Sequence, residues 1–165
     1  MDAALHKMLL KKAGSLLARR SYSRGELRNK LSGFAEKSQV ESVLDRLEQL
    51  NLLNDADYAY NFALCRTRQE GWGPAKILES LLRRHVDQTT IENALEGVRN
   101  ELGDESILVE YIRKHCGKQG MPTDLKGVRK LVLHLRRRGF DEERIFGALK
   151  QMIPSALLQR FDTGE

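Results

Sequence analysis

ILESLLRRHVDQTTIENAL at residues 77–95 and LVLHLRRRGFDEERIFGAL at residues 131–149 are two copies of one pattern. Five apolar positions match at a displacement of 54 residues: Ile77/Leu131, Leu81/Leu135, Val86/Phe140, Ile91/Ile145 and Leu95/Leu149. Four further positions match at the same displacement: Arg83/Arg137, Arg84/Arg138, Asp87/Asp141 and Ala94/Ala148. A third, earlier copy has slightly altered gaps and consists of Leu27, Leu31, Phe34, Val40 and Leu44. The chain therefore reads as a tandem repeat.

Apolar residues recur at three- and four-residue spacing along almost the whole chain, and no stretch alternates for long enough to be a strand. Ser23 with Glu26, and Ser38 with Glu41, have the spacing of a capping box at a helix start. Further expected caps are Asp55, Asp87, Asp104, Thr123 and Asp141. The pattern predicts an all-α fold of nine helices, near residues 4–20, 24–33, 39–50, 55–70, 74–84, 88–101, 105–116, 124–138 and 142–152.

Three tandem three-helix units follow from this pattern. They cover residues 1–53, residues 54–103 and residues 104–165, and the third is basic and ends in a short C-terminal tail. A unit of about 50 residues buries little surface alone. We therefore expect the units to stack into an elongated modular array that can curve.

The net charge of +5 is unevenly distributed along the 165 residues. Residues 1–30 have a net charge of +6, residues 36–57 of −4, and residues 113–138 of +8, with nine Lys and Arg against one Asp. Alternating charged segments favour a polyanion or a charged protein surface as partner. A solvated surface is the alternative explanation for any one segment.

The sequence favours a cytoplasmic protein with no membrane partner. The N-terminus lacks the apolar run of a signal peptide, and no stretch approaches the roughly 20 apolar residues of a membrane span. Cys65 and Cys116 show no pairing pattern, as expected in a reducing compartment.

Motifs for catalysis are absent from the sequence. There is no phosphate-binding loop, no dinucleotide fingerprint and no H-E-x-x-H motif. His115 and Cys116 are adjacent, but no second pair lies at metal-ligand spacing. We therefore expect no enzymatic activity, no metal and no cofactor.

The only tryptophan lies in the segment EGWGPAKI at residues 70–77. Glycine on each side of Trp72 gives a tight turn, and Pro74 suits the first position of the next helix. Two interpretations are open. Trp72 packs into the core of a helix–helix corner, or it contacts a partner together with Lys76.

A basic series follows in the third unit: Arg113, Lys114, Lys118, Lys126, Arg129, Lys130, Arg136, Arg137 and Arg138. Lys126, Arg129, Lys130 and Arg137 lie at helical steps, so one helix face would collect them. Such a face suits the phosphates of nucleic acid and equally suits an acidic protein surface. The spacing does not separate these two partners.

From about residue 13 to residue 150 the sequence resembles the RecX family. The resemblance rests on SRGELRNKL at residues 23–31, on Leu53-Asn54-Asp55 leading to Tyr58-Ala59, on Arg66-Thr67-Arg68, and on GWGPAKI at residues 71–77. One position departs from the family pattern, because His85 stands before Val86 where glycine is usual. Glycine adopts the left-handed conformation of a helix cap without cost. In the third unit, Gly139 before Phe140 keeps the expected glycine.

The resemblance implies three three-helix repeats and a regulatory function in DNA recombination, repair and the SOS response. Such proteins bind RecA nucleoprotein filaments and inhibit ATP hydrolysis, strand exchange and coprotease activity. The candidate contact residues are Trp72, Lys76, Arg83, Arg84, Lys126, Arg129, Lys130, Arg136, Arg137 and Arg138. The main alternative is a helical protein that binds single- or double-stranded DNA without the recombinase, and a second is a structural adaptor.

Overall fold

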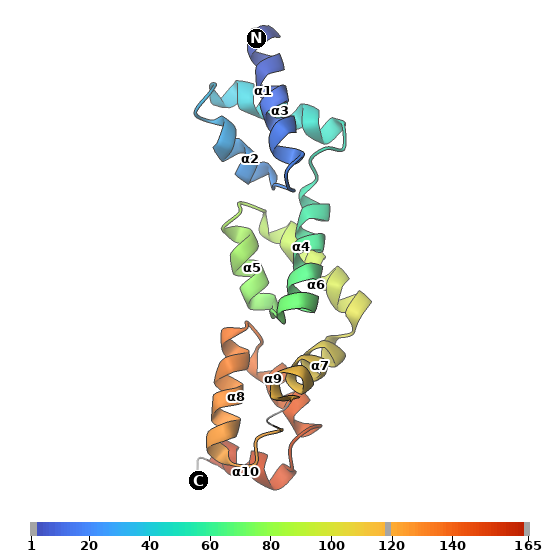
Figure 1. The fold of residues 1–165 in the computed structure, drawn as a ribbon, viewed down its shortest axis with the longest axis vertical. Helices are drawn as coiled ribbons and strands as arrows, with labels where there is room; N and C mark the ends of the chain where they lie inside the picture. The colour runs from blue at the N-terminus through green and yellow to red at the C-terminus, as the bar shows by residue number, and fades with distance from the viewer. Residues whose placement is uncertain (1–2, 118–119, 164–165) are drawn as a thin grey trace. The chain divides into compact units, whose positions relative to one another are not determined.

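The computed structural model describes residues 3–117 and 120–163 (Figure 1). Helices are the only regular elements in this part of the chain. They are α1 (Ala3–Leu17), α2 (Arg24–Leu31), α3 (Lys37–Gln49), α4 (Asp55–Glu70), α5 (Pro74–Leu82), α6 (Gln88–Leu102), α7 (Asp104–Cys116), α8 (Leu125–Arg137), α9 (Glu142–Lys150) and α10 (Ser155–Thr163). The all-α prediction is confirmed, whereas the shape of the array stays a prediction.

A tenth helix replaces the expected C-terminal tail. Helix α10 begins directly after Pro154, and Leu158 on it is buried. Leu157 and Phe161 pack against the same apolar cluster as Leu158, so tertiary packing rather than a strong start signal explains this helix. The prediction of nine helices was wrong at this end.

The chain forms two compact units, and α4, α5 and α6 each contribute residues to both. Compact unit 1 comprises residues 1–62 and 80–94, and compact unit 2 comprises residues 63–79 and 95–165. Apolar side chains of α1, α2 and α3 form one cluster in compact unit 1. A second cluster, in compact unit 2, joins α7, α8, α9 and α10. The division into three-helix units remains a prediction.

The predicted helix caps are confirmed in part. The Ser23 and Glu26 capping box is present, and Asp87 and Asp141 each accept a backbone N–H as predicted. The Ser38 and Glu41 box was wrong, because α3 begins earlier and Ser38 falls inside its first turn. The cap positions before α4, α7 and α8 are likewise one residue away from prediction, at Asn54, Gly103 and Asp124 in place of Asp55, Asp104 and Thr123.

The unit 1 joint is the contact in which the start of α2 meets the turn after α5. The Ser23 hydroxyl donates to the backbone carbonyl of Arg84, and both residues belong to compact unit 1. A Cβ added to Gly25 would lie 2.2 Å from the Cβ of His85, so only glycine fits there. His85 has a φ of 59°, which confirms the left-handed cap expected at this position.

The unit 2 joint repeats this arrangement between α5 and α8. The backbone N–H of Gly73 donates to the carbonyl of Arg138 at 2.7 Å, and that of Ala75 donates to the carbonyl of Gly139 at 3.1 Å. Gly139 has a φ of 91°, and a Cβ on it would lie 2.5 Å from the backbone nitrogen of Lys76. In compact unit 1 the start of α2 therefore contacts the end of α5, and in compact unit 2 the start of α5 contacts the end of α8.

A cluster of charges ties α2 to α3. The Arg24 guanidinium contacts Glu41 at 2.7 Å, Asp45 at 2.6 Å and Glu48 at 2.6 Å, and Arg28 also pairs with Glu41. Asp55 accepts the backbone N–H of Arg24 at 2.7 Å and so satisfies an amide at the start of α2. The hydrogen bond from Arg28, helped by Arg24, lowers the pKa of Glu41 to about 2.

The two joints predict opposite effects for substitutions at equivalent positions. His85→Gly should stabilise the protein by up to about 1 kcal/mol, because glycine removes the strain of the left-handed conformation. Gly139→Ala should destabilise it by at least about 1 kcal/mol, because the added Cβ meets Lys76 at a positive φ. Urea unfolding of the two variants measures both changes. A loss of stability in His85→Gly would contradict the assignment of strain to this turn.

The Arg24 cluster predicts a pH dependence of stability. Because the pKa of Glu41 is lowered, its contribution is complete above about pH 4.5 and is lost as the pH falls toward 2. Glu41→Gln should cost roughly 1–2 kcal/mol at pH 7, less than the full pKa shift implies because the cluster is partly solvated. The difference from the parent protein should shrink between pH 4.5 and pH 2.5. Glu96→Gln, on an exposed stretch of α6, is the control, and an equal cost there would refute the argument.

Candidate functional site

Helix α8 presents a basic face to solvent. Its buried side consists of Val128, Leu131, Val132 and Leu135, which belong to the apolar cluster of compact unit 2. The opposite side, here called the α8 basic face, consists of the exposed residues Lys126, Arg129, Lys130, Leu133, Arg136 and Arg137. The sequence prediction that one face collects the cations is confirmed, and Lys118 of the same basic series lies outside the described residues.

Among residues 3–117 and 120–163, the ion pair that the α8 basic face makes is with an acidic residue of α9. Arg136 pairs with Glu142 at 3.0 Å, and the helix itself contains no acidic residue. Leu133 lies among the cations with 49% of its surface exposed. Arginine and lysine on a fixed helix surface can bind phosphates or carboxylates, and an exposed leucine adds an apolar contact.

Arg138 is built into the corner where α8 ends. Its guanidinium donates to the carbonyl of Glu70 at 2.8 Å and lies 5.7 Å from the ring centre of Tyr111. Its own carbonyl accepts the N–H of Gly73 in the unit 2 joint. Arg138 is half-buried and holds the segment around Trp72 in place, and its predicted contact with a partner stays a prediction.

Trp72 is half-buried, so its exposure lies between that of a core residue and that of an exposed partner contact. Its backbone N–H donates to the carbonyl of Arg66 at 3.2 Å. The Lys76 ammonium lies 4.3 Å and the Arg66 guanidinium 5.0 Å from the ring centre, which are cation–π distances. Gly71 before it has a φ of 60°, and a Cβ there would lie 2.1 Å from the ring of Tyr111. The turn is therefore fixed, and part of the indole remains accessible.

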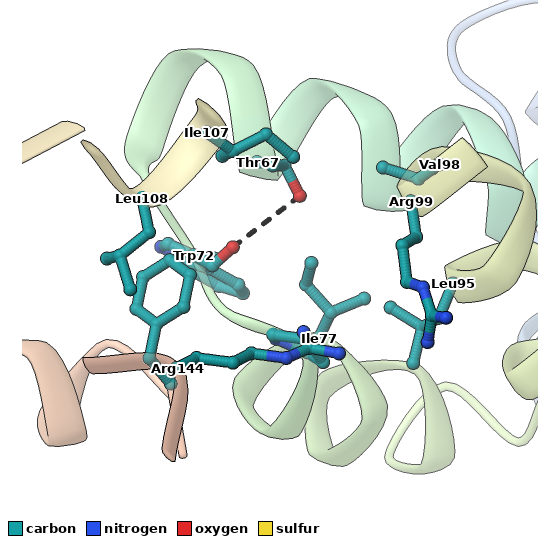
Figure 2. A pocket seen from close by; sticks show the side chains of 11 residues that line it. Thr67, Trp72, Ile77, Leu95, Val98, Arg99, Ile107, Leu108 and Arg144 are labelled. Carbon is teal, nitrogen blue, oxygen red and sulfur yellow. Dashed lines mark hydrogen bonds between the residues drawn. The ribbon is translucent and has the colours of Figure 1, made fainter. Parts of the chain in front are cut away.

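A small cavity of about 40 Å³ lies beside Trp72 (Figure 2). Apolar side chains form most of its wall: Trp72, Pro74, Ile77, Leu95, Val98, Ile107, Leu108 and Phe140. Thr67 also lines it and donates from its hydroxyl to the Trp72 carbonyl at 3.5 Å. Arg99 and Arg144 complete the lining, and all these residues belong to compact unit 2.

Arg83 and Arg84 belong to compact unit 1, whereas the other predicted contact residues belong to compact unit 2. Arg84 is half-buried, donates to the carbonyl of Ser80 at 2.8 Å and to its hydroxyl at 2.7 Å, and lies 4.7 Å from the ring centre of Phe62. Arg83 is exposed. Of the predicted residues, the structure brings Trp72, Lys76 and Arg138 together at one corner and places five cations on α8.

Three residues were not predicted as part of the site. Leu133 could have been found, because it lies three or four positions from Arg129, Lys130, Arg136 and Arg137 and so shares their face. Arg99 and Arg144 carry no such signal, since only the tertiary fold brings α6 and α9 to the cavity beside Trp72.

Tyr111, His115 and His134 form an aromatic stack between α7 and α8. The imidazole rings of His115 and His134 lie 4.1 Å apart, and the Tyr111 hydroxyl is 2.9 Å from Nε2 of His134. Burial, with the neighbouring charges of His115, Arg138 and Arg137, lowers the pKa of His134. The lowered pKa favours the neutral imidazole of His134 over the charged one.

Across residues 3–117 and 120–163, no group of three or more His, Cys, Asp or Glu is placed to hold a metal ion. No helix in the same described ranges combines the length and the apolar composition needed to cross a bilayer.

Comparisons with known proteins agree on one family. Residues 54–95 match the family model for the second three-helix domain of RecX. The chain is 34% identical over 146 residues to a protein from Prosthecochloris aestuarii named "Regulatory protein RecX", covering 87% of this chain and 93% of that one. It is 37% identical over 138 residues to the protein of the same name from Pseudomonas tolaasii, covering 81% and 84%.

A solved structure shares the fold. The crystal structure of RecX from Lactobacillus salivarius superposes with a TM-score of 0.76 at 20% identity, covering 91% of this chain and 97% of that one. The family model and the curated relatives lead to one conclusion: the chain belongs to the RecX family of regulatory proteins.

Proposed function

We propose that this protein binds RecA nucleoprotein filaments in the cytoplasm and inhibits their ATP hydrolysis, strand exchange and coprotease activity. It would thereby regulate DNA recombination and repair. The α8 basic face is the observation that carries this proposal, in a chain that belongs to a family of regulatory proteins. No catalytic motif in the sequence points to an activity of its own.

The α8 basic face suits a filament because a filament is a regular array of negative charge. Five exposed cations on one helix create a local field that acts over about 8–10 Å in physiological salt. Such a field speeds the encounter with a charged groove and sets orientation more than final affinity. Leu133 at the centre of the face supplies an apolar contact that water cannot replace.

Tandem repeats suit a partner that is itself repetitive. Each unit that contacts one protomer raises the effective concentration of the next unit near the neighbouring protomer. One bound molecule then affects several protomers, so inhibition should not require one inhibitor for each recombinase.

The second candidate function is binding to nucleic acid without the recombinase. The same α8 basic face supports it, because phosphate contacts need cations and no specific protein partner. The two functions differ in whether binding depends on the filament.

ATP turnover tests the proposal directly. The purified protein alone should hydrolyse no ATP, and it should slow the single-strand-dependent ATPase of RecA when added below the recombinase concentration. Phosphate release measured over a dilution series gives both results. Unchanged RecA turnover at an excess of the protein would refute the proposed function.

Reversing the charge of the α8 basic face separates the two functions. Arg129→Glu/Lys130→Glu/Arg137→Glu should fold normally, since all three side chains are exposed, and should inhibit RecA at least about tenfold less well at low salt. The difference in inhibition between the variant and the parent protein should narrow as salt rises, because screening weakens the attraction of the parent protein to the filament. Inhibition and binding to naked single-stranded DNA are measured across one salt series.

The matched control is Lys7→Glu/Lys11→Glu/Arg19→Glu, which makes the same change of charge at exposed positions of compact unit 1. Equal loss in both triple variants would show that only net charge matters. Loss of DNA binding with undiminished inhibition in the α8 variant would contradict the role given to this face.

A further inference from the structure

Tyr111, His115 and His134 form a stack that connects α7 and α8 to the turn of residues 71–73, here called the Trp72 turn. The Tyr111 ring lies against Gly71, where an added Cβ would be 2.1 Å from the ring. The Tyr111 hydroxyl shares a hydrogen bond of 2.9 Å with Nε2 of His134. All these residues belong to compact unit 2. A movement of the Tyr111 ring would therefore affect both the α7–α8 contact and the Trp72 turn.

The two imidazoles lie face to face. Their ring centres are 4.1 Å apart and their planes differ by 11°. His115 is exposed, so protons reach the pair from solvent, whereas His134 is half-buried. Two neutral rings pack favourably at this distance, but two imidazolium cations repel each other, the more so where water is partly excluded. Ring nitrogens bind a metal in the plane of the ring, and two nearly parallel planes do not meet at one ion, so the geometry suits protons.

The charges that act on His134 are positive. Burial lowers the pKa of His134, and the charges of His115, Arg138 and Arg137 lower it further. Arg138 also lies 5.7 Å from the ring centre of Tyr111. Within the described residues, no carboxylate of α7, α9, α10 or the segment before α5 is among the charges that act on His134. A second positive charge on the imidazole pair therefore has no compensating anion.

Acids close in sequence to the stack and to the Trp72 turn contact other cations. These pairs are Glu70 with Arg66, Glu110 with Lys114 at 2.7 Å, Asp141 with Arg144 at 3.3 Å and Glu142 with Arg136 at 3.0 Å. Glu143, in the first turn of α9, is exposed. The other charged side chains near the stack on α7 and α8 are exposed cations: Arg113, Lys114, Lys130 and Arg136.

We propose that His115 and His134 form a proton-sensitive contact that holds the Trp72 turn in place when the pair is neutral and releases it when both rings are protonated. Repulsion between the stacked cations separates the rings, and Tyr111 moves with His134 because their side chains share a hydrogen bond. This inference goes beyond the proposed function, since the contact needs neither DNA nor a recombinase.

Movement of Tyr111 removes the support of the Trp72 turn. The ring no longer lies against Gly71, so the turn is less constrained on that side. The hydrogen bond of 2.7 Å from the Gly73 N–H to the Arg138 carbonyl then opens more often. The exchange of this amide hydrogen with solvent reports the opening.

The direction of the pH effect follows from the lowered pKa of His134. Once the stack opens, His134 regains its ordinary pKa of 6.5 and binds a proton more readily than in the closed stack. The closed state is therefore most stable above about pH 6.5, and its stability falls as the pH drops below this value, until His134 is protonated in the closed state too. One histidine that takes up no proton in the closed state supplies at most about a tenfold change in opening between pH 7.5 and pH 5.5.

Amide hydrogen exchange of the whole protein, resolved by NMR and corrected for the intrinsic rate at each pH, tests the proposal. The Gly73 amide should exchange about five- to tenfold faster at pH 5.5 than at pH 7.5. Leu27 is the control amide, because it donates to the Ser23 carbonyl at 3.0 Å at the start of α2 in compact unit 1. Its corrected rate should change by less than about twofold.

Three variants assign the response to the stack. His134→Gln keeps a partner for the Tyr111 hydroxyl and takes up no proton, so the change at Gly73 should fall below about twofold. His115→Gln, at an exposed position that does not affect folding, should reduce the change by at least about half, because it removes one of the two repelling charges. His85→Asn, in compact unit 1, is the matched control and should keep the full change. Thermal melting at pH 7.5 checks that each variant is folded.

Any of four results would overturn the inference. These are a corrected Gly73 rate that is equal at both pH values, an equal change at Leu27, a full change in His134→Gln or His115→Gln, or loss of the change in His85→Asn. The exposed position of His115 keeps the test decisive even where His134→Gln does not fold. No recombinase is present in these measurements, so their failure and the failure of filament inhibition are separate results.

Discussion

Buried amides at the start of a helix and carbonyls at the end of one must find partners, and this requirement governs the structure. Both joints satisfy a carbonyl after one middle helix with a donor from the start of another, which is the Ser23 hydroxyl in the unit 1 joint and the Gly73 N–H in the unit 2 joint. The contact is close enough to demand glycine at Gly25, Gly73 and Gly139. The carbonyl of an arginine accepts in both joints, Arg84 in the first and Arg138 in the second, and the Gly139 carbonyl is a further acceptor in the second.

The close contact in each joint gives its two adjacent arginines different surroundings. Arg84 and Arg138 lie where the helix turns into the joint, and their guanidinium groups donate to carbonyls within their own compact unit. Arg83 and Arg137 each precede them by one residue, which rotates the side chain by about 100° and leaves it exposed. In both joints, one arginine therefore stabilises the corner and the arginine before it faces solvent, although the sequence shows only two adjacent cations.

Periodicity predicted most of the fold because helix α8 and its equivalents bury one face at regular spacing. The Ser23 box was predicted from adjacent residues, since caps depend on local sequence, whereas the left-handed His85 was expected from the glycine that the RecX pattern has at this position. Helix α10 depends on packing and was missed, whereas α3 begins at a local capping box of Glu36 and Gln39 that was predicted two residues too late, at Ser38. The site followed the same division: the α8 basic face was predicted from helical spacing, whereas Arg99 and Arg144 reach the cavity only through the fold.

Compact unit 2 combines two surfaces of different chemistry. On the proposed function, the α8 basic face would attract its partner from a distance and tolerate variation in it, because charge attraction depends weakly on shape. The cavity beside Trp72 differs from this face, because its volume is about 40 Å³ and most of its wall is apolar. The unit 2 joint fixes the turn that carries Trp72, through the hydrogen bond from the Gly73 N–H to the Arg138 carbonyl. A change that loosens this joint would alter the cavity and leave the charge on α8 untouched, so the two surfaces can be varied separately.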